Sequence, residues 1–109
     1  MSKRKVLFVC TQNLMRSPTA EEVFRDYSGI ETRSAGIGFS SKNYLQDCLL
    51  EWADIVFVME KRHKDHIVKK FGKTARYTRI ICLSIPDMYS YMDKDLIEIL
   101  KIRVTPFLK

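Results

Sequence analysis

Hydrophobic residues gather in three short, almost uninterrupted runs, at residues 5–9 (KVLFV), 54–59 (DIVFVM) and 79–85 (RIICLSI). Because apolar and polar residues do not alternate strictly in these runs, they are typical of strands buried on both faces of a parallel sheet. Residues 29–36 (GIETRSAG) form a weaker and more polar run. We expect this fourth strand at an edge of the sheet.

Segments with helical periodicity separate the predicted strands. After Ser17 and Pro18, apolar side chains recur every three or four residues as far as Tyr27. Ser17 fits the N-cap of this helix and Pro18 its first helical position. Further helices are predicted over residues 43–52, over residues 61–72 with Gly72 as the stop signal, and over residues 94–107 until Pro106 ends the helix.

The alternation of strands and helices predicts an α/β fold, a three-layer doubly wound four-stranded parallel sheet with helices on both faces. Right-handed crossovers would join the strands, and ligands of such folds bind at the carboxyl ends of the strands. The sequence has no repeat, low-complexity tract or long linker. We therefore expect residues 1–109 to form a single domain.

The composition, with 46% hydrophobic and 29% charged residues, is that of a globular domain. A net charge of +6 suits an anionic ligand. The sequence has no basic stripe interleaved with aromatic residues, so we do not expect nucleic acid as a partner. The apolar runs are too short to cross a bilayer, and the N-terminus lacks the features of a secretory signal. We therefore expect a cytoplasmic protein with reduced thiols and no membrane partner.

Candidate chemistry lies between Cys10, at the end of the first strand, and Arg16, at the start of the first helix. Backbone N–H groups in such a loop can surround an anion, and the helix directs its positive end at the same place. This field and the Arg16 guanidinium favour a Cys10 thiolate, which is a nucleophile. A guanidinium fork holds two oxygens of a transferring phosphoryl group. Alone, a cysteine after a strand is more often a core residue.

In its context, VLFVCTQNLMRSPTAE (residues 6–21) resembles the V-C-x5-R-S-P signature of the low-molecular-weight protein tyrosine phosphatases, and includes their loop asparagine. Three later segments are similar to motifs of that family and follow in the same order: RSAG (33–36), ADIVFVME (53–60) and SIPDMY (84–89). The resemblance implies a short, divergent protein-tyrosine-phosphatase that needs no metal or other cofactor. Its substrate would be a phosphotyrosine protein or a small aryl phosphate, and its product inorganic phosphate.

Three catalytic residues follow from the resemblance. Cys10 would attack the phosphate monoester and become a phosphocysteine, and Arg16 would clamp the transition state. Asp87 would protonate the leaving phenolate and then activate water. Asp93 is a rival for this role, although it also fits the N-cap of the last helix. We favour Asp87 because it lies closer to the end of the strand.

The resemblance also implies how the loop is held. Asn13 would keep the loop in an unusual backbone shape, since asparagine tolerates a positive φ, and Ser34 would support it. Ser17 would donate a hydrogen bond to the sulfur. The backbone of the loop would bind the phosphoryl oxygens, and the phosphate-binding residues would be Thr11, Gln12, Asn13, Leu14, Met15, Arg16 and Ser17.

The sequence departs from the family at two positions around this site. Met88 follows Asp87 where the family usually has proline, and Met15 stands where relatives often have a second cysteine. A disulfide within the loop that protects Cys10 is therefore impossible.

The segment between RSAG and ADIVFV is shorter than in the family, where it carries an aromatic wall and a histidine that supports the loop asparagine. We find no counterpart of that histidine. Tyr89 and Tyr91 are placed to flank a phenyl phosphate, and Phe39 or Tyr44 could replace the missing aromatic wall.

The remaining histidines and cysteines carry weaker signals. His63 and His66 flank Asp65 in a lysine-rich segment without an evident third metal ligand, which favours a solvated basic face. Cys48 and Cys82 are expected to pack in the core.

Three other functions stay open. Arsenate reductases share the loop but need two further cysteines for a disulfide relay, and no cysteine follows Cys82. Phosphocysteine carriers of sugar transport do not need Arg16. A non-catalytic module that binds phosphate or nucleic acid is compatible with the shortened cleft and the positive charge.

Overall fold

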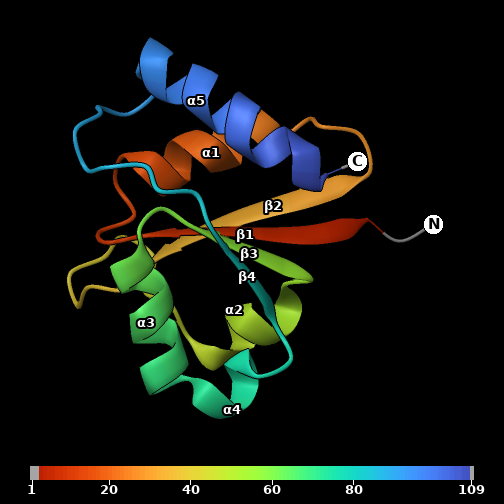
Figure 1. Cartoon of the computed structure of the whole chain (residues 1–109), viewed down its shortest axis with the longest axis vertical. Helices are drawn as coiled ribbons and strands as arrows, with labels where there is room; N and C mark the ends of the chain where they lie inside the picture. Colours follow the sequence, from red (N-terminus) through yellow and green to blue (C-terminus); the bar gives the residue numbers. More distant parts are fainter. Residues whose placement is uncertain (1–2, 109) are drawn as a thin grey trace.

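The structure of the protein, a computed structural model, describes residues 3–108. Its centre is a parallel sheet with the strand order β2-β1-β3-β4 (Figure 1). All four residues of β3 are buried, as are the last five residues of β1, and these strands lie in the middle of the sheet. The strands are β1 (Arg4–Cys10), β2 (Ile30–Gly36), β3 (Ile55–Val58) and β4 (Arg79–Cys82). The predicted parallel sheet, with β2 at an edge, is confirmed.

Helices cover both faces of the sheet (Figure 1). One face carries α1 (Arg16–Phe24) and α5 (Lys94–Val104), which contact each other, and a 3-10 turn (Thr105–Phe107) follows α5. The other face carries α2 (Asp47–Trp52), α3 (Lys61–Lys70) and α4 (Gly72–Ala75). The predicted three-layer α/β fold is therefore confirmed. Within residues 3–108, no helix has the length and apolar character needed to cross a bilayer.

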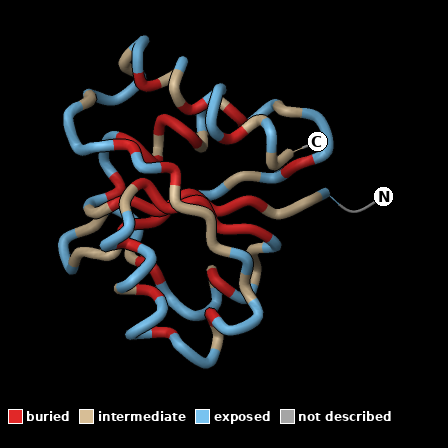
Figure 2. The backbone as a smooth tube through the Cα atoms, in the orientation of Figure 1, coloured by how far each residue is buried: buried red, intermediate tan, exposed pale blue. Residues whose placement is uncertain are grey.

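The central strand β1 contributes to two apolar cores, one on each face of the sheet. Val6 and Phe8 pack with α1 and α5, whereas Leu7 and Val9 point to the opposite core. The Phe8 ring stacks on Phe24 and on Phe57, with centroid separations of 5.9 and 5.5 Å. Burial of one such ring stabilises the fold by about 1.5–3 kcal/mol. Figure 2 shows the buried residues concentrated in the sheet and on the inner faces of the helices.

Several predicted helix boundaries were wrong. The first helix begins at Arg16 with Met15 as its N-cap residue, so Ser17 is not the N-cap. Gly72 does not end the helix that begins at residue 61, because that helix stops at Lys70 and Gly72 opens the short α4. The helix predicted over residues 43–52 begins only at Asp47. The last helix tightens into the 3-10 turn, which accommodates Pro106.

Candidate active site

The predicted site residues meet where the sheet presents the carboxyl ends of its strands. Cys10 ends β1, and a cavity of about 370 Å³ opens beside it. The Asp87 carboxylate reaches this cavity from the segment that follows β4. The cavity is lined by Cys10, Thr11, Gln12, Leu14, Met15, Arg16 and Asp87.

The Cys10 thiol is almost fully buried and contacts one hydroxyl. Its Sγ atom lies 2.9 Å from Oγ of Ser17. Ser17 lies in the first turn of α1 and its side chain is turned back to the sulfur rather than capping the helix. Asn13 donates a hydrogen bond of 2.9 Å to Ser17 Oγ. The hydroxyl hydrogen of Ser17 has two acceptors within reach, the sulfur at 2.9 Å and the Ala35 carbonyl at 3.4 Å, and the sulfur is the nearer one. A hydroxyl donor at this place stabilises a negatively charged sulfur.

Asn13 is the centre of a hydrogen-bond chain behind the loop. Its φ of 56° lies in the left-handed region, which asparagine tolerates better than most residues. Its amide nitrogen donates to both Ser17 and Ser34, at 2.9 Å each. Ser34 in turn donates to a carboxylate oxygen of Glu21 on α1. The loop conformation therefore depends on β2 and α1. The sequence had indicated Ser34 as the support of Asn13, and Glu21 extends this network by one further residue.

Arg16 is buried, and one of its terminal nitrogens is fully used by the protein. Nη1 donates to Oε1 of Glu60 at 2.5 Å and to the carbonyl of Ile85 at 2.7 Å. On the opposite edge, Nε lies 3.8 Å from Oδ1 of Asp87. Within residues 3–108 no hydrogen bond engages Nη2. The Nε–Nη2 edge can therefore donate hydrogen bonds to two oxygens of an anion in the cavity.

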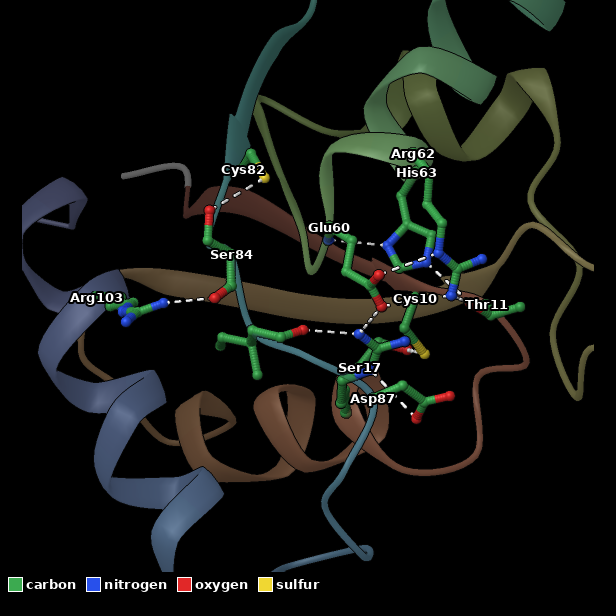
Figure 3. A network of polar contacts seen from close by, with 12 residues as sticks. Cys10, Thr11, Ser17, Glu60, Arg62, His63, Cys82, Ser84, Asp87 and Arg103 are labelled. Atoms are coloured by element: carbon green, nitrogen blue, oxygen red, sulfur yellow. Dashed lines mark hydrogen bonds and ion pairs between the residues drawn. The ribbon is translucent and has the colours of Figure 1, made fainter.

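Glu60, directly after β3, is the fixed negative partner of this arginine. The hydrogen bond from Arg62, together with the contact to Arg16, lowers the Glu60 pKa to about 2 despite partial burial. Nε of Arg62 donates to Oε2 of Glu60 at 3.1 Å. Two guanidinium groups, those of Arg16 and Arg62, therefore share one carboxylate beside the loop. Figure 3 shows Arg62 next to Glu60.

His63 was wrongly predicted to lie on a solvated basic face. The side chain is fully buried, and its Nδ1 accepts a hydrogen bond of 3.0 Å from the backbone N–H of Glu60. Its Nε2 lies 2.9 Å from Oγ1 of Thr11. Burial, followed by the nearby Arg16 and Arg62 charges, lowers the His63 pKa to about 4, so the imidazole is neutral at neutral pH.

A second loop supports the cysteine loop from outside. The backbone N–H of Gly38 and the hydroxyl of Ser41 both donate to the carbonyl of Thr11, at 2.9 and 3.0 Å. A Cβ at Gly36 would lie only 2.7 Å from that same carbonyl oxygen, so this close approach requires glycine. Residues 37–43 therefore support the cysteine loop, although they do not line the cavity beside Cys10.

The two candidate acids occupy different environments. Asp87 is exposed at the mouth of the cavity, on the side of Cys10 and Arg16. Asp93 caps α5, where Oδ1 accepts hydrogen bonds from the backbone N–H groups of Asp95 and Leu96. Asp93 thus has a structural use, and Asp87 is the carboxylate near the thiol.

The aromatic candidates do not line this cavity. Tyr89 is partly buried and packs against the apolar core, and Phe39 is 93% exposed. Tyr44 stacks on Phe39 and lies under the Lys70 ammonium group. Tyr91 borders a neighbouring cavity of about 540 Å³, which shares Leu14 and Met15 with the first. Side chains of Leu14 and Met15 therefore form the apolar rim of the cysteine cavity.

The remaining cysteines differ from the expectation that both pack in the core. Cys48 is exposed on α2, so its prediction was wrong, and Cys82 is partly buried. Residues 3–108 contain no group of three or more His, Cys, Asp or Glu side chains that could hold a metal ion.

Comparison with known proteins agrees with this geometry. The family profile of the low molecular weight phosphotyrosine protein phosphatases matches residues 5–47, the part that contains the cysteine loop and Ser34. The chain is similar to this family over that segment, which is less than half of its length. It is 29% identical over 119 residues to the low molecular weight protein-tyrosine-phosphatase Ptp of Acinetobacter johnsonii, with 84% of each chain covered.

Two further comparisons, one with a curated protein and one with a solved structure, give the range of the similarity. A protein-arginine-phosphatase of Bacillus subtilis is 31% identical over 96 residues, which cover 62% of this chain and 63% of that protein's length. The crystal structure of the low molecular weight protein tyrosine phosphatase from T. tengcongensis superposes with a TM-score of 0.80, at 24% identity, and covers 97% of this chain and 98% of that one. The phosphatase fold is therefore shared over nearly the whole chain.

Proposed function

We propose that the protein is a cysteine-dependent phosphatase that hydrolyses aryl phosphate monoesters, and that its physiological substrate is a phosphotyrosine protein. The observation that carries the proposal is the arrangement around one cavity. Cys10 Sγ lies against a hydroxyl donor, and Asp87 and the open edge of Arg16 border the same space. A nucleophile, an acid and an oxyanion clamp thus surround a volume that accommodates a phosphoryl group.

In the first step, the Cys10 thiolate attacks phosphorus. The S–P bond forms while the bond from phosphorus to the aryl oxygen breaks, and Asp87 transfers its proton to that oxygen. The Nε–Nη2 edge of Arg16 and the backbone N–H groups of the loop hold the three remaining oxygens. The products are the free phenol and a phosphocysteine.

In the second step, water attacks the phosphocysteine. The Asp87 carboxylate removes a proton from the water, the O–P bond forms, and the S–P bond breaks. The thiolate leaves with the hydrogen bond from Ser17 that stabilises its charge. Inorganic phosphate is released, and Asp87 is protonated for the next cycle. Neither step requires a metal or cofactor.

The rim of the cavity favours tyrosine over arginine as the phosphorylated residue. Leu14 and Met15 present exposed apolar side chains that would pack on a phenyl ring. The Arg62 guanidinium near the cavity would repel a second guanidinium. Phosphoarginine is the competing candidate substrate, because the chain is also similar to a protein-arginine-phosphatase of Bacillus subtilis. Parallel assays with phosphotyrosine and phosphoarginine peptides distinguish the two substrates.

The proposed enzyme acts in the cytoplasm on soluble phosphoproteins. Support comes from the three thiols, since residues 3–108 form no disulfide and a thiolate nucleophile needs reducing conditions.

Turnover of p-nitrophenyl phosphate under reducing conditions tests the activity. The wild-type protein should release p-nitrophenol, and Cys10→Ser should release none at equal protein concentration. Cys48→Ser is the matched control because Cys48 is exposed on α2 and does not line the cavity, so it should retain wild-type turnover. No turnover by the wild-type protein would instead favour a module that binds phosphate without hydrolysing it.

A further inference from the structure

The hydroxyl group of Thr11 receives hydrogen bonds from two different side chains of α3. His63 Nε2 lies 2.9 Å from Oγ1 of Thr11, and Nη2 of Arg62 lies 2.8 Å from the same oxygen. Both α3 residues are more than fifty positions away in the chain. Figure 3 shows the histidine and the arginine converging on Thr11 beside Cys10.

The direction of the hydrogen bond from His63 follows from its other nitrogen. Nδ1 faces the backbone N–H of Glu60, which can only donate, so Nδ1 must be the acceptor. A neutral imidazole with an unprotonated Nδ1 carries its hydrogen on Nε2. The buried ring is neutral, because burial lowers its pKa to about 4. His63 therefore donates to Thr11, as does Arg62.

A hydroxyl oxygen that accepts two hydrogen bonds has used both lone pairs, and its own hydrogen remains to be donated. Within residues 3–108, this hydroxyl has hydrogen bonds only with these two donor nitrogens, and no acceptor takes its hydrogen. Thr11 lines the same cavity as Cys10 and Asp87. Its backbone is held in place by the contacts of its carbonyl with Gly38 and Ser41.

We propose that the Thr11 hydroxyl donates its hydrogen to an oxygen of the phosphoryl group bound in this cavity, and that His63 is the positioning residue that sets its direction. The phosphoryl group thereby gains a side-chain donor besides Arg16 and the loop backbone. Arg62 adds a positive charge behind this donor. The inference deepens the proposed function, and it rests on phosphate binding in this cavity.

The test compares Thr11→Val with Thr11→Ser by titration of inorganic phosphate in an NMR or calorimetric experiment. Valine has the shape of threonine without a donor, whereas serine keeps the hydroxyl. A hydrogen bond to a charged group is worth enough to raise the dissociation constant about tenfold or more in Thr11→Val. Thr11→Ser should remain near the wild type. Thr74→Val on α4 is the matched control, because Thr74 bonds to Asp47 away from this cavity.

The role of His63 is tested with two substitutions. His63→Leu removes the donor and should raise the phosphate dissociation constant, as Thr11→Val does. His63→Gln can restore an N–H donor and should recover part of the lost phosphate affinity. A purely structural role would lower the melting temperature of these variants and leave the phosphate dissociation constant of the folded protein unchanged.

Equal phosphate affinity of Thr11→Val and the wild type would overturn the inference, as would an equal loss in Thr11→Val and Thr11→Ser. Absence of phosphate binding by the wild-type protein would also overturn it. Binding without hydrolysis of p-nitrophenyl phosphate by the wild type would refute the proposed activity alone, and the Thr11 comparison would still decide the inference.

Discussion

Arg16 and Glu60 form an ion pair with 2.5 Å between Nη1 and Oε1, although 44 positions separate them in the chain. The pair fixes the guanidinium from behind, so that its other edge faces the cavity that Cys10 borders. Glu60 is itself held by Arg62. The catalytic arginine of the proposed enzyme is therefore oriented by a carboxylate that does not line the cavity.

Glu60→Gln should lower kcat/KM for p-nitrophenyl phosphate by roughly ten- to a hundredfold, because a displaced clamp loses alignment with the transition state. Most of the loss should fall on kcat. Asp65→Asn is the matched control, since Asp65 is an exposed carboxylate on α3 whose ion-pair contact is with Lys61, at 4.0 Å. Unchanged kinetics in Glu60→Gln would show that the ion pair does not orient Arg16.

Asp87→Asn should slow the hydrolysis of phenyl phosphate by roughly 10²- to 10⁴-fold, the usual contribution of a general acid. The loss in the phosphorylation step should be much smaller with p-nitrophenyl phosphate, because p-nitrophenolate leaves without a proton. Single-turnover kinetics with both esters measure this difference. Asp93→Asn should instead lower the melting temperature by weakening the cap of α5. A leaving-group effect in Asp93→Asn would assign the acid to that residue.

The free energy of unfolding should fall as the pH is lowered from about 6.5 towards 4, because of His63. The folded-state pKa of His63 is about 4, whereas its ordinary value is 6.5. Between these values the unfolded chain binds a proton that the folded protein does not, so stability rises with pH across this window. Urea unfolding at several pH values measures the slope, and His63→Gln should have a smaller one. An equal slope in that variant would contradict a buried neutral histidine.

Ser34→Ala should weaken the chain that runs from Glu21 through Asn13 to Ser17. Asn13 then loses one acceptor, and the loop loses part of the support for its positive φ. We expect a several-fold lower kcat and a loss of about 1 kcal/mol in stability, the usual contribution of one such hydrogen bond. Steady-state kinetics and urea unfolding measure both. Thr78→Val is the control that should preserve kcat, because the Thr78 hydroxyl donates to the backbone of α4 and has no contact with this chain of hydrogen bonds.

The fold and the cysteine loop could be predicted because their signals are local. Continuous apolar runs identify buried parallel strands, and the spacing of Cys10 and Arg16 in one loop reveals an anion site. The contacts of Glu60, Arg62 and His63 could not be predicted in the same way, because 44 to 52 positions separate them from Arg16 and Thr11. Only the packing of α3 beside the loop brings them together. The Glu60-x-x-His63 spacing at a helix start was the one local signal for the buried histidine.

Surface exposure was also hard to read from residue type. Cys48 lies on the outer side of α2, where the apolar neighbour Leu50 faces the core. Ser17 had the residue type of an N-cap, but the helix begins two residues earlier than expected, with Met15 as its N-cap residue, and the Ser17 hydroxyl contacts the sulfur. In both cases the position of the residue on its helix, and not the usual preference of its residue type, determines where the side chain lies.

Trapping the phosphocysteine tests the central claim most directly. Asp87→Ala mixed with p-nitrophenyl phosphate should still be phosphorylated, because the leaving group needs no acid, while the hydrolysis step is slowed by the lost base. Acid quench and peptide mass spectrometry should then find one phosphoryl group on the peptide that contains Cys10. The same experiment on Cys10→Ala, which has no nucleophile at this position, should find none. A phosphoryl group on another residue, or turnover with Cys10 never modified, would contradict the account.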